Sequence, residues 1–189
     1  MARALDHLIV AARDLDEGAA WVRDRLGVDV LPGGKHAAMG THNRVLSLGP
    51  GAYLEVIAID PDAPKPPGPR WMSLDTAATQ ALLARGPALI HWVERTDDLE
   101  AEVAAIGGGL EIRPFERGPF RWRMALPPDG SLPGRGLRPT LIQWDSEHPA
   151  GRLPDSGCRL VALGGPGRRE ARIATATGER AIAWRLPAE

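Results

Sequence analysis

The chain has 189 residues, of which 43% are hydrophobic and 25% are charged. This length and composition are sufficient for one packed core or two small fused ones. The net charge of −1 comes from 23 basic and 24 acidic residues, so it gives no reason to expect a nucleic acid or an anionic membrane surface as a partner. No apolar run approaches the ~20 residues needed to cross a bilayer.

The first residues and the cysteine count indicate the compartment. The chain enters an apolar strand within its first few residues and lacks the apolar segment and cleavage site of a secretory signal. Cys158 is the single cysteine, so no internal disulfide can form, which suits a reducing compartment. We therefore expect a cytoplasmic protein.

The first predicted unit has the order β-α-β-β-β. An apolar strand over 5–11 is followed by Asp14 and Glu17, whose spacing is typical of a capping pair at a helix start. Apolar residues then recur at helical spacing until Gly27, which is placed to end the helix. Three further strands are predicted over 28–31, 43–48 and 52–59.

A proline-rich loop over 61–69 follows, and then a short helix over 74–85 that Asp75 would cap. After it the same order of elements begins again. This second unit has a strand predicted over 89–94, a helix opened by residues 97–100 with Leu99, Val103 and Ile106 facing inward, and three more strands predicted over 110–114, 120–126 and 140–145. The last part of the chain predicts strands over 159–163, 172–176 and 180–186.

The two units align as an internal repeat. A shift of 84 residues places His7 on His91, and a shift of 88 residues places Glu55 on Gln143. The capping residues and the apolar faces of the two helices also superpose, so chance similarity is a poor explanation. The sequence therefore predicts an α+β protein with paired modules over about 5–60 and 88–146 inside a domain of residues 1–157. Residues 158–189 are predicted to be a C-terminal β extension packed on the same domain.

His7, His91 and Glu55 are the polar residues with the strongest case for chemistry. Both histidines lie at equivalent positions in strands that are otherwise apolar, and Glu55 lies between two apolar residues of its strand. Taken singly, each can be a hydrogen-bonded or solvent-facing structural residue. Taken together, two histidines and one carboxylate are a plausible ligand set for a divalent metal with open positions for substrate.

The three other histidines carry weaker signals. His42 and Asn43 follow a glycine at the start of a strand and could either hydrogen-bond a ligand or shape a turn. His36 is a weaker candidate, and His148 precedes a proline and is expected in a surface turn. The chain has no phosphate-binding glycine loop before a helix and no nucleophile elbow, so nucleotide and acyl-transfer chemistry are not supported.

The opening of the chain resembles that of the vicinal oxygen chelate superfamily, most closely its glyoxalase-like domain proteins. The stretches that carry the resemblance are residues 6–10, Asp14-Leu15, residues 26–28, 40–44, 53–58 and 148–150. The resemblance implies that the paired modules curl into a cupped, barrel-like mixed sheet around a central metal. It also implies that the ligands come from the first and fourth strands of each unit, which here are His7, Glu55, His91 and Gln143.

Gln143 departs from the glutamate that glyoxalase I has at this place, and an amide cannot act as a general base. The first hypothesis is a metal-dependent enzyme of lyase, isomerase or dioxygenase type that acts on a small oxygenated substrate. In it, His7, Glu55 and His91 would hold Zn, Fe, Mn or Ni, Glu55 would also be the catalytic base, and His42, Asn43 and Gln143 would contact the substrate.

Two alternatives remain open on the sequence alone. One is a metal-free module that binds or sequesters a small molecule, similar to bleomycin-resistance proteins, and the other is a partner protein with a vestigial site. The partner expected from the sequence is a small-molecule ligand, and exposed apolar sheet edges could favour a homodimer.

Overall fold

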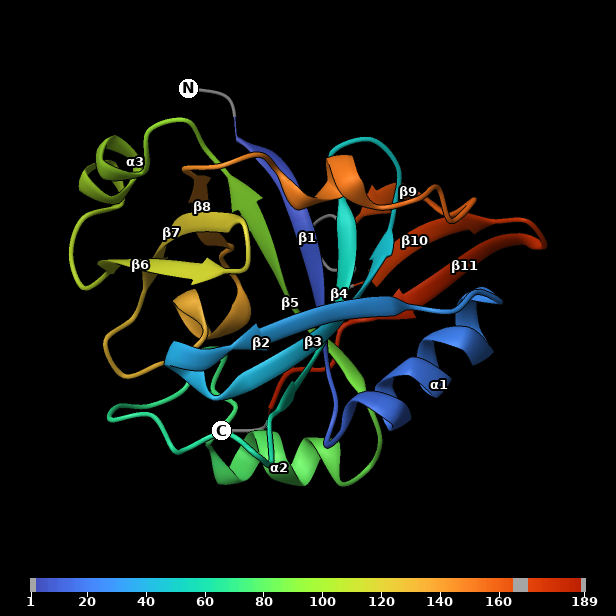
Figure 1. The fold of residues 1–189 in the computed structure, drawn as a ribbon, viewed down its shortest axis with the longest axis horizontal. Helices are drawn as coiled ribbons and strands as arrows, with labels where there is room; N and C mark the ends of the chain where they lie inside the picture. The colour runs from blue at the N-terminus through green and yellow to red at the C-terminus, as the bar shows by residue number, and fades with distance from the viewer. Residues whose placement is uncertain (1–2, 165–169, 188–189) are drawn as a thin grey trace.

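A computed structural model describes residues 3–164 and 170–187 of the chain. Its main feature is a strongly curled, mixed sheet that forms a half-barrel (Figure 1). Among the described residues this sheet contains the eight strands β1 (Ala4–Ala11), β2 (Leu31–His36), β3 (Thr41–Ser47), β4 (Tyr53–Ile59), β5 (Ala88–Arg95), β6 (Glu111–Arg117), β7 (Phe120–Leu126) and β8 (Thr140–Trp144).

The strand order β2-β3-β4-β1-β5-β8-β7-β6 consists of two equivalent halves. In each half the first strand pairs in parallel with the fourth, as β1 with β4 and β5 with β8. The halves meet where β1 pairs antiparallel with β5. The predicted α+β fold with a cupped mixed sheet is therefore confirmed.

Two of the helices begin where the sequence predicts. In α1 (Leu15–Leu26) the Asp14 carboxylate accepts a hydrogen bond from the Glu17 backbone N–H, and the helix ends at Gly27, which has a φ of 74°. In α3 (Leu99–Ile106) Asp98 caps the first turn in the same way. No helix among the described residues is long and apolar enough to cross a membrane.

Two elements begin three residues later than predicted. The second strand begins at Leu31, because Gly27 turns the chain out of α1 and the glycine-rich segment that follows pairs with β3. Helix α2 (Ala77–Leu83) begins later than expected and is capped by Thr76. Asp75 is not available as the cap, because its carboxylate accepts hydrogen bonds from the backbone N–H and the guanidinium of Arg70.

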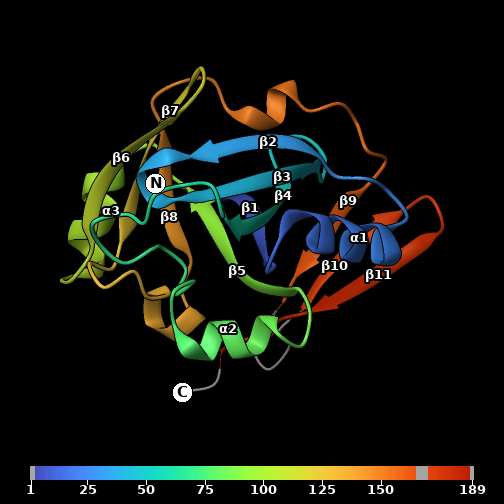
Figure 2. The ribbon, with the colours of Figure 1, turned by 60° about the horizontal axis from the view of Figure 1, so that its bottom comes forward.

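Different layers cover the two faces of the sheet (Figure 2). The back of the first half packs against α1 and against a second, three-stranded sheet of β9 (Arg159–Leu163), β10 (Glu170–Thr175) and β11 (Gly178–Ala183). The back of the second half packs against α3. The concave face carries the largest core cluster, which includes residues of α2. Short 3-10 turns occur at Ala37–Met39 (η1), Pro133–Gly136 (η2) and Pro149–Arg152 (η3).

Candidate functional site

Asp6 and His7, which are neighbours in β1, both contact residues on the concave face of the sheet. The pairing of β1 with β5 shifts register between Leu5 and His7, so Asp6 is an extra residue at an irregularity of the ladder. Leu5 packs toward the back core, whereas His7 lines a recess on the concave face and Asp6 bonds to Trp144, which lines the same recess. The irregularity thus places a carboxylate directly beside the imidazole of His7.

Asp6 is fully buried and fully hydrogen-bonded. Its Oδ1 lies 2.7 Å from His7 Nδ1, and its Oδ2 accepts hydrogen bonds from Trp144 Nε1 at 2.8 Å and from His148 Nε2 at 2.9 Å. Burial by itself would raise the pKa of Asp6, but the hydrogen bonds from His148 and His7 outweigh it and hold the pKa well below its usual range. The Asp6 carboxylate is therefore ionised and fixes the proton of His7 on Nδ1.

The other nitrogen of His7 faces Glu55. Glu55 lies on β4, the parallel neighbour of β1, and its Oε2 is 3.5 Å from His7 Nε2. The His7 ring stacks on Tyr53 with 4.6 Å between the ring centroids. Burial raises the pKa of Tyr53 far above its usual value, and the negative Asp6 and Glu55 add to this effect. Tyr53 therefore stays neutral and acts as a packing surface for the imidazole.

Asn43 connects Glu55 with a cation from the other half of the molecule. Its Nδ2 donates to Glu55 Oε1 at 2.5 Å, and its Oδ1 accepts hydrogen bonds from Gly34 N at 2.8 Å and from Arg117 Nη1 at 2.9 Å. Reversing the amide would set oxygen against the carboxylate and NH₂ against the guanidinium, so these three partners determine its orientation.

His36 completes the polar wall of the recess. Its Nδ1 lies 3.1 Å from Thr41 Oγ1, and its Nε2 lies 3.2 Å from Arg117 Nη1 and 3.9 Å from Glu55 Oε1. Burial lowers the pKa of His36 to about 4; the negative Glu55 opposes this shift, and the positive Arg117 supports it. His36 is therefore neutral near pH 7, and its Nε2 accepts the hydrogen bond from Arg117.

The recess formed by these side chains is narrow, with a volume of about 30 Å³, which is room for one or two water molecules. Its polar walls come from His7, His36, Glu55 and Arg117, and aromatic and aliphatic side chains form the rest. Trp71 lines it too, is 4% exposed, and carries a buried Nε1 that has no hydrogen-bond partner among the described residues. Such a donor is costly to bury, so it indicates a site for an acceptor oxygen.

A wider pocket of about 570 Å³ adjoins the recess. Tyr53 and Arg117 line both spaces, so they form the boundary between them. The volume of the outer pocket is within the range of small-molecule sites, whereas that of the recess is far below it. The two spaces together can therefore hold the reacting end and the body of one small molecule.

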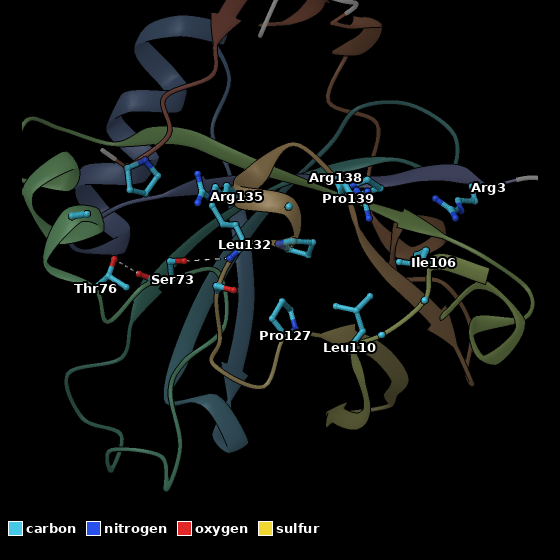
Figure 3. A pocket seen from close by; sticks show the side chains of 18 residues that line it. Arg3, Ser73, Thr76, Ile106, Leu110, Pro127, Leu132, Arg135, Arg138 and Pro139 are labelled. Carbon is cyan, nitrogen blue, oxygen red and sulfur yellow. Dashed lines mark hydrogen bonds between the residues drawn. The ribbon is translucent and has the colours of Figure 1, made fainter. Parts of the chain in front are cut away.

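A still larger pocket, of about 900 Å³, lies elsewhere (Figure 3). Its labelled walls include Ser73 and Thr76 on one side, Ile106 and Leu110 on another, and Arg135 near the centre. None of the polar residues of the recess lines it. Size alone therefore does not identify the site, and the buried polar network does.

Comparison with known proteins agrees with this architecture. The family model described as "Glyoxalase-like domain" matches residues 5–180. The chain belongs to this glyoxalase-like family, within the vicinal oxygen chelate superfamily. The resemblance seen in the sequence is thereby confirmed. No curated protein matches the chain.

Several solved structures are similar to this glyoxalase-like protein at low identity. A hypothetical protein from Staphylococcus aureus is 14% identical, with 98% of this chain and 88% of that chain covered and a TM-score of 0.56. A hypothetical protein from Bacillus halodurans is 16% identical, with 78% and 96% covered and a TM-score of 0.50. The methylmalonyl-CoA epimerase of Mycobacterium tuberculosis is 18% identical, with 79% and 91% covered and a TM-score of 0.48.

The glyoxalase-like chain brings His7 and Glu55 together as expected, but His91 does not reach the recess. His91 Nε2 accepts a hydrogen bond from the Thr140 backbone N–H at 3.1 Å, which occupies its lone pair and leaves the proton on Nδ1. That Nδ1 is buried without a hydrogen-bond partner in the described residues. Burial lowers the pKa of His91 to about 3, and the nearby His7 adds to the shift. His91 is a neutral core residue that links β5 to β8.

Gln143 and His42 also lie away from the recess. Gln143 Oε1 accepts a hydrogen bond from the Leu99 backbone N–H at the start of α3, so this side chain faces the helix layer. The neighbouring Ile142 and Trp144 line the recess instead, and the strand registers place Thr140, three residues before Gln143, at the position of Glu55. His42 alternates with Asn43 in β3 and does not line the recess, whereas Asn43 bonds directly to Glu55.

These placements bear on the predicted metal. In the described part of the chain, no three His, Cys, Asp or Glu side chains come together as a metal-binding group. His7 Nε2 and Glu55 Oε2 are suitable donors, but His91 is engaged elsewhere and the Arg117 guanidinium occupies His36 Nε2. The residues present therefore do not fit a divalent metal held by His7, Glu55 and His91.

Several residues of the site were not singled out by the sequence. Arg117 comes from the second unit, and no local pattern marks it. Trp71 lies in an irregular segment between the units. His148 was expected in a surface turn, but it caps η3 and bonds to Asp6. One available signal was the pair Gly33-Gly34 inside a strand, because glycine there is typical of a close approach by other atoms.

Proposed function

We propose that the recess binds the carbonyl end of a small oxygenated molecule and that Glu55 moves a proton at the carbon next to that carbonyl. His7 assists Glu55, and no metal held by the predicted trio takes part. The molecule's body lies in the outer pocket, on the other side of Tyr53 and Arg117.

The observation that carries the proposal is the 3.5 Å approach of His7 Nε2 to Glu55 Oε2, with His7 Nδ1 bound to Asp6. Because Asp6 holds the His7 proton on Nδ1, the Nε2 lone pair faces Glu55 and accepts a hydrogen bond from Glu55 once that carboxylate has taken a proton. In the reaction the C–H bond breaks, an O–H bond forms on Glu55, and the electron pair stays on the substrate as an enolate. Return of the proton completes the cycle.

The recess also offers stabilisation for the enolate oxygen. Trp71 Nε1 is a buried donor without a partner in the described residues, and Arg117 brings a positive charge. Donors that are fixed before the reaction stabilise developing negative charge effectively, because they need no reorganisation. This combination supports chemistry at a carbonyl compound more than hydrolysis or phosphate transfer.

A second candidate function is metal-free binding without chemistry. The observation that favours it is the separation of His91 from the recess, because the ligand set that would define a metal-dependent enzyme is not assembled among the described residues. In that case Asn43, Glu55 and Arg117 would serve recognition alone.

Proton exchange with solvent distinguishes these functions. Protein dialysed against EDTA is incubated in D₂O with 2-oxobutanoate and with pentane-2,3-dione, and proton NMR follows deuterium uptake at the carbon next to the carbonyl. We expect uptake above the buffer rate, and Glu55→Gln should lower it by about 10²-fold or more. Glu111→Gln, at an exposed residue of β6, is the matched control.

Each result of the exchange experiment supports a different function. Absence of exchange with both probes, or full exchange by Glu55→Gln, would overturn the proton-transfer proposal. Binding of a probe without exchange would support the binding function. Exchange that appears only after Zn²⁺ or Mn²⁺ is added would restore the metal-dependent hypothesis.

A further inference from the structure

We propose that the molecule bound by the recess carries an oxyanion, a carboxylate or its phosphonate equivalent, and that Arg117 binds this group at the boundary with the outer pocket. The inference rests on the proposed small-molecule function of the recess. It deepens that proposal by naming the substrate class.

Arg117 is a cation that forms no ion pair with a carboxylate among the described residues. Its Nη1 donates to Asn43 Oδ1 and lies beside His36 Nε2, and both of these partners are neutral. No carboxylate in the described ranges lies within 4.0 Å of its guanidinium. By contrast, Arg123 on the neighbouring strand is paired with both Glu100 and Asp145. A half-buried guanidinium without a counter-ion is suited to bind one from outside.

The side chain of Arg117 is held in place before any ligand arrives. A Cβ atom on Gly34 would lie 2.8 Å from Arg117 Cδ, so the aliphatic stem runs closely over this glycine. The guanidinium lies 5.8 Å from the centre of the Phe120 ring, a cation–π contact. Because Nη1 is fixed by Asn43, the Nε and Nη2 donors remain for a ligand, and little rotamer freedom is lost when it binds.

The charged residues that line the outer pocket are positive, which suits an anionic ligand. The lining residues include Lys35, Arg117 and Arg152 and no Asp or Glu. Lys35 is paired with Asp60 at 2.7 Å and Arg152 with Glu147 at 2.8 Å, so Arg117 is the lining cation that lacks a carboxylate partner among the described residues. Apolar lining residues such as Phe120 and Leu153 would contact the rest of the molecule.

The position of Arg117 sets the order of groups along the ligand. Arg117 lines both the recess of about 30 Å³ and the outer pocket of about 570 Å³. A carbonyl in the recess therefore has the oxyanion close to it, as in a 2-oxo acid, and any larger substituent extends into the outer pocket. This geometry favours a small 2-oxo acid over a neutral diketone.

Binding of matched probes tests the inference. 2-Oxobutanoate, neutral pentane-2,3-dione and propionylphosphonate differ in the group next to the carbonyl, and isothermal titration measures each with wild type, Arg117→Gln, Arg117→Lys and Arg121→Gln. Arg121 is an exposed arginine on β7 of the same hairpin and serves as the charge-matched control. Circular dichroism checks that each variant is folded.

We expect wild type and Arg121→Gln to bind 2-oxobutanoate at least about tenfold more tightly than the diketone, since a charge-assisted hydrogen bond contributes that much or more. Arg117→Gln should lose this preference, and Arg117→Lys should keep part of it. If propionylphosphonate binds as tightly as 2-oxobutanoate, the site accepts oxyanions in general. If propionylphosphonate does not bind, the site is specific for a carboxylate.

Two results would overturn the inference: equal wild-type affinity for the acid and the diketone, or an unchanged preference in Arg117→Gln. Failure of the proton-transfer proposal gives a different pattern. In that case wild type and Glu55→Gln would both prefer the acid through Arg117, and neither would exchange deuterium.

Discussion

His7 Nδ1 lies 2.7 Å from Asp6 Oδ1, although neighbouring residues of a regular strand point to opposite faces of the sheet. The register shift of β1 against β5 at this point allows the contact. The same carboxylate also accepts hydrogen bonds from Trp144 and His148, so it joins both halves of the sheet to η3. Asp6 is a positioning residue: it acts on the recess through His7.

Replacement of Asp6 by asparagine should weaken both the fold and the site. An amide cannot accept all three hydrogen bonds of the carboxylate, so we expect the free energy of unfolding to fall by about 2–3 kcal/mol. The pH profile of deuterium exchange should also move, because the proton of His7 is no longer held on Nδ1 by a negative charge. Asp24→Asn, at an exposed residue of α1, should change neither quantity. An unchanged pH profile in Asp6→Asn would mean that Asp6 stabilises the fold but does not act on the recess through His7.

Acid should destabilise the protein through two buried histidines. The pKa of His36 is lowered to about 4 and that of His91 to about 3, whereas an unfolded chain has histidines near 6.5. Between these values the unfolded state binds more protons, so stability is greatest above pH 6.5 and falls as the pH drops, by about 1.4 kcal/mol per pH unit for each histidine. Urea unfolding at pH 7, 5.5 and 4.5 measures this. His91→Leu should lose less stability on acidification than wild type, and an equal loss would contradict the assignment.

The orientation of Asn43 should depend on the absence of a side chain at Gly33. A Cβ atom at Gly33 would lie 2.1 Å from Asn43 Oδ1 and 2.8 Å from the Asn43 backbone oxygen. We expect Gly33→Ala to cost about 1–3 kcal/mol of stability and to weaken probe binding, because Asn43 must move away from Glu55 and Arg117. Gly68→Ala is the control, since its Cβ would meet no atom within 4 Å and should leave both measurements near wild type.

Gln143 should matter for α3 and not for the recess. Its Oε1 accepts the Leu99 N–H at 2.8 Å, so Gln143→Ala leaves a backbone donor of the first helical turn without this acceptor. We expect a loss of about 0.5–1.5 kcal/mol in thermal or urea unfolding, with probe affinity unchanged. Gln143→Glu retains an acceptor at the helix N-terminus and should restore most of the stability. A large loss of probe affinity in Gln143→Ala would instead support the substrate contact expected from the sequence.

The sequence was informative about the fold because the signals for it are local. The caps at Asp14 and Asp98, the apolar periodicity of the helices and the repeat of element order each depend on a few neighbouring residues. Together they specify two equivalent units, and equivalent units pair as equivalent halves of one sheet. The late start of β2 was missed because a strand of glycine, proline and lysine is held by its partner strand and lacks β-forming residues.

The site was less predictable because it depends on strand irregularities and on contacts between residues that are distant in the sequence. Simple alternation cannot indicate the extra residue at Asp6, and it cannot indicate that Thr140, three residues before Gln143, takes the place of Glu55. Arg117 reaches the recess across the cup from β6, the far edge strand of the second half. His7 and His91 occupy equivalent positions in the repeat, but the Thr140 N–H engages only the second of them.

The three-stranded C-terminal sheet limits how far this chain can be shortened. Ala171, Ile173 and Ile182 are at most 2% exposed and share one core with Leu8 and Val56 on the back of the main sheet. A chain that stopped after β8 would present that back surface to water as an apolar patch. The repeat visible in the sequence thus does not mark a free-standing module: one half depends on a segment that has no counterpart in the other, and a minimal recombinant version has to include it.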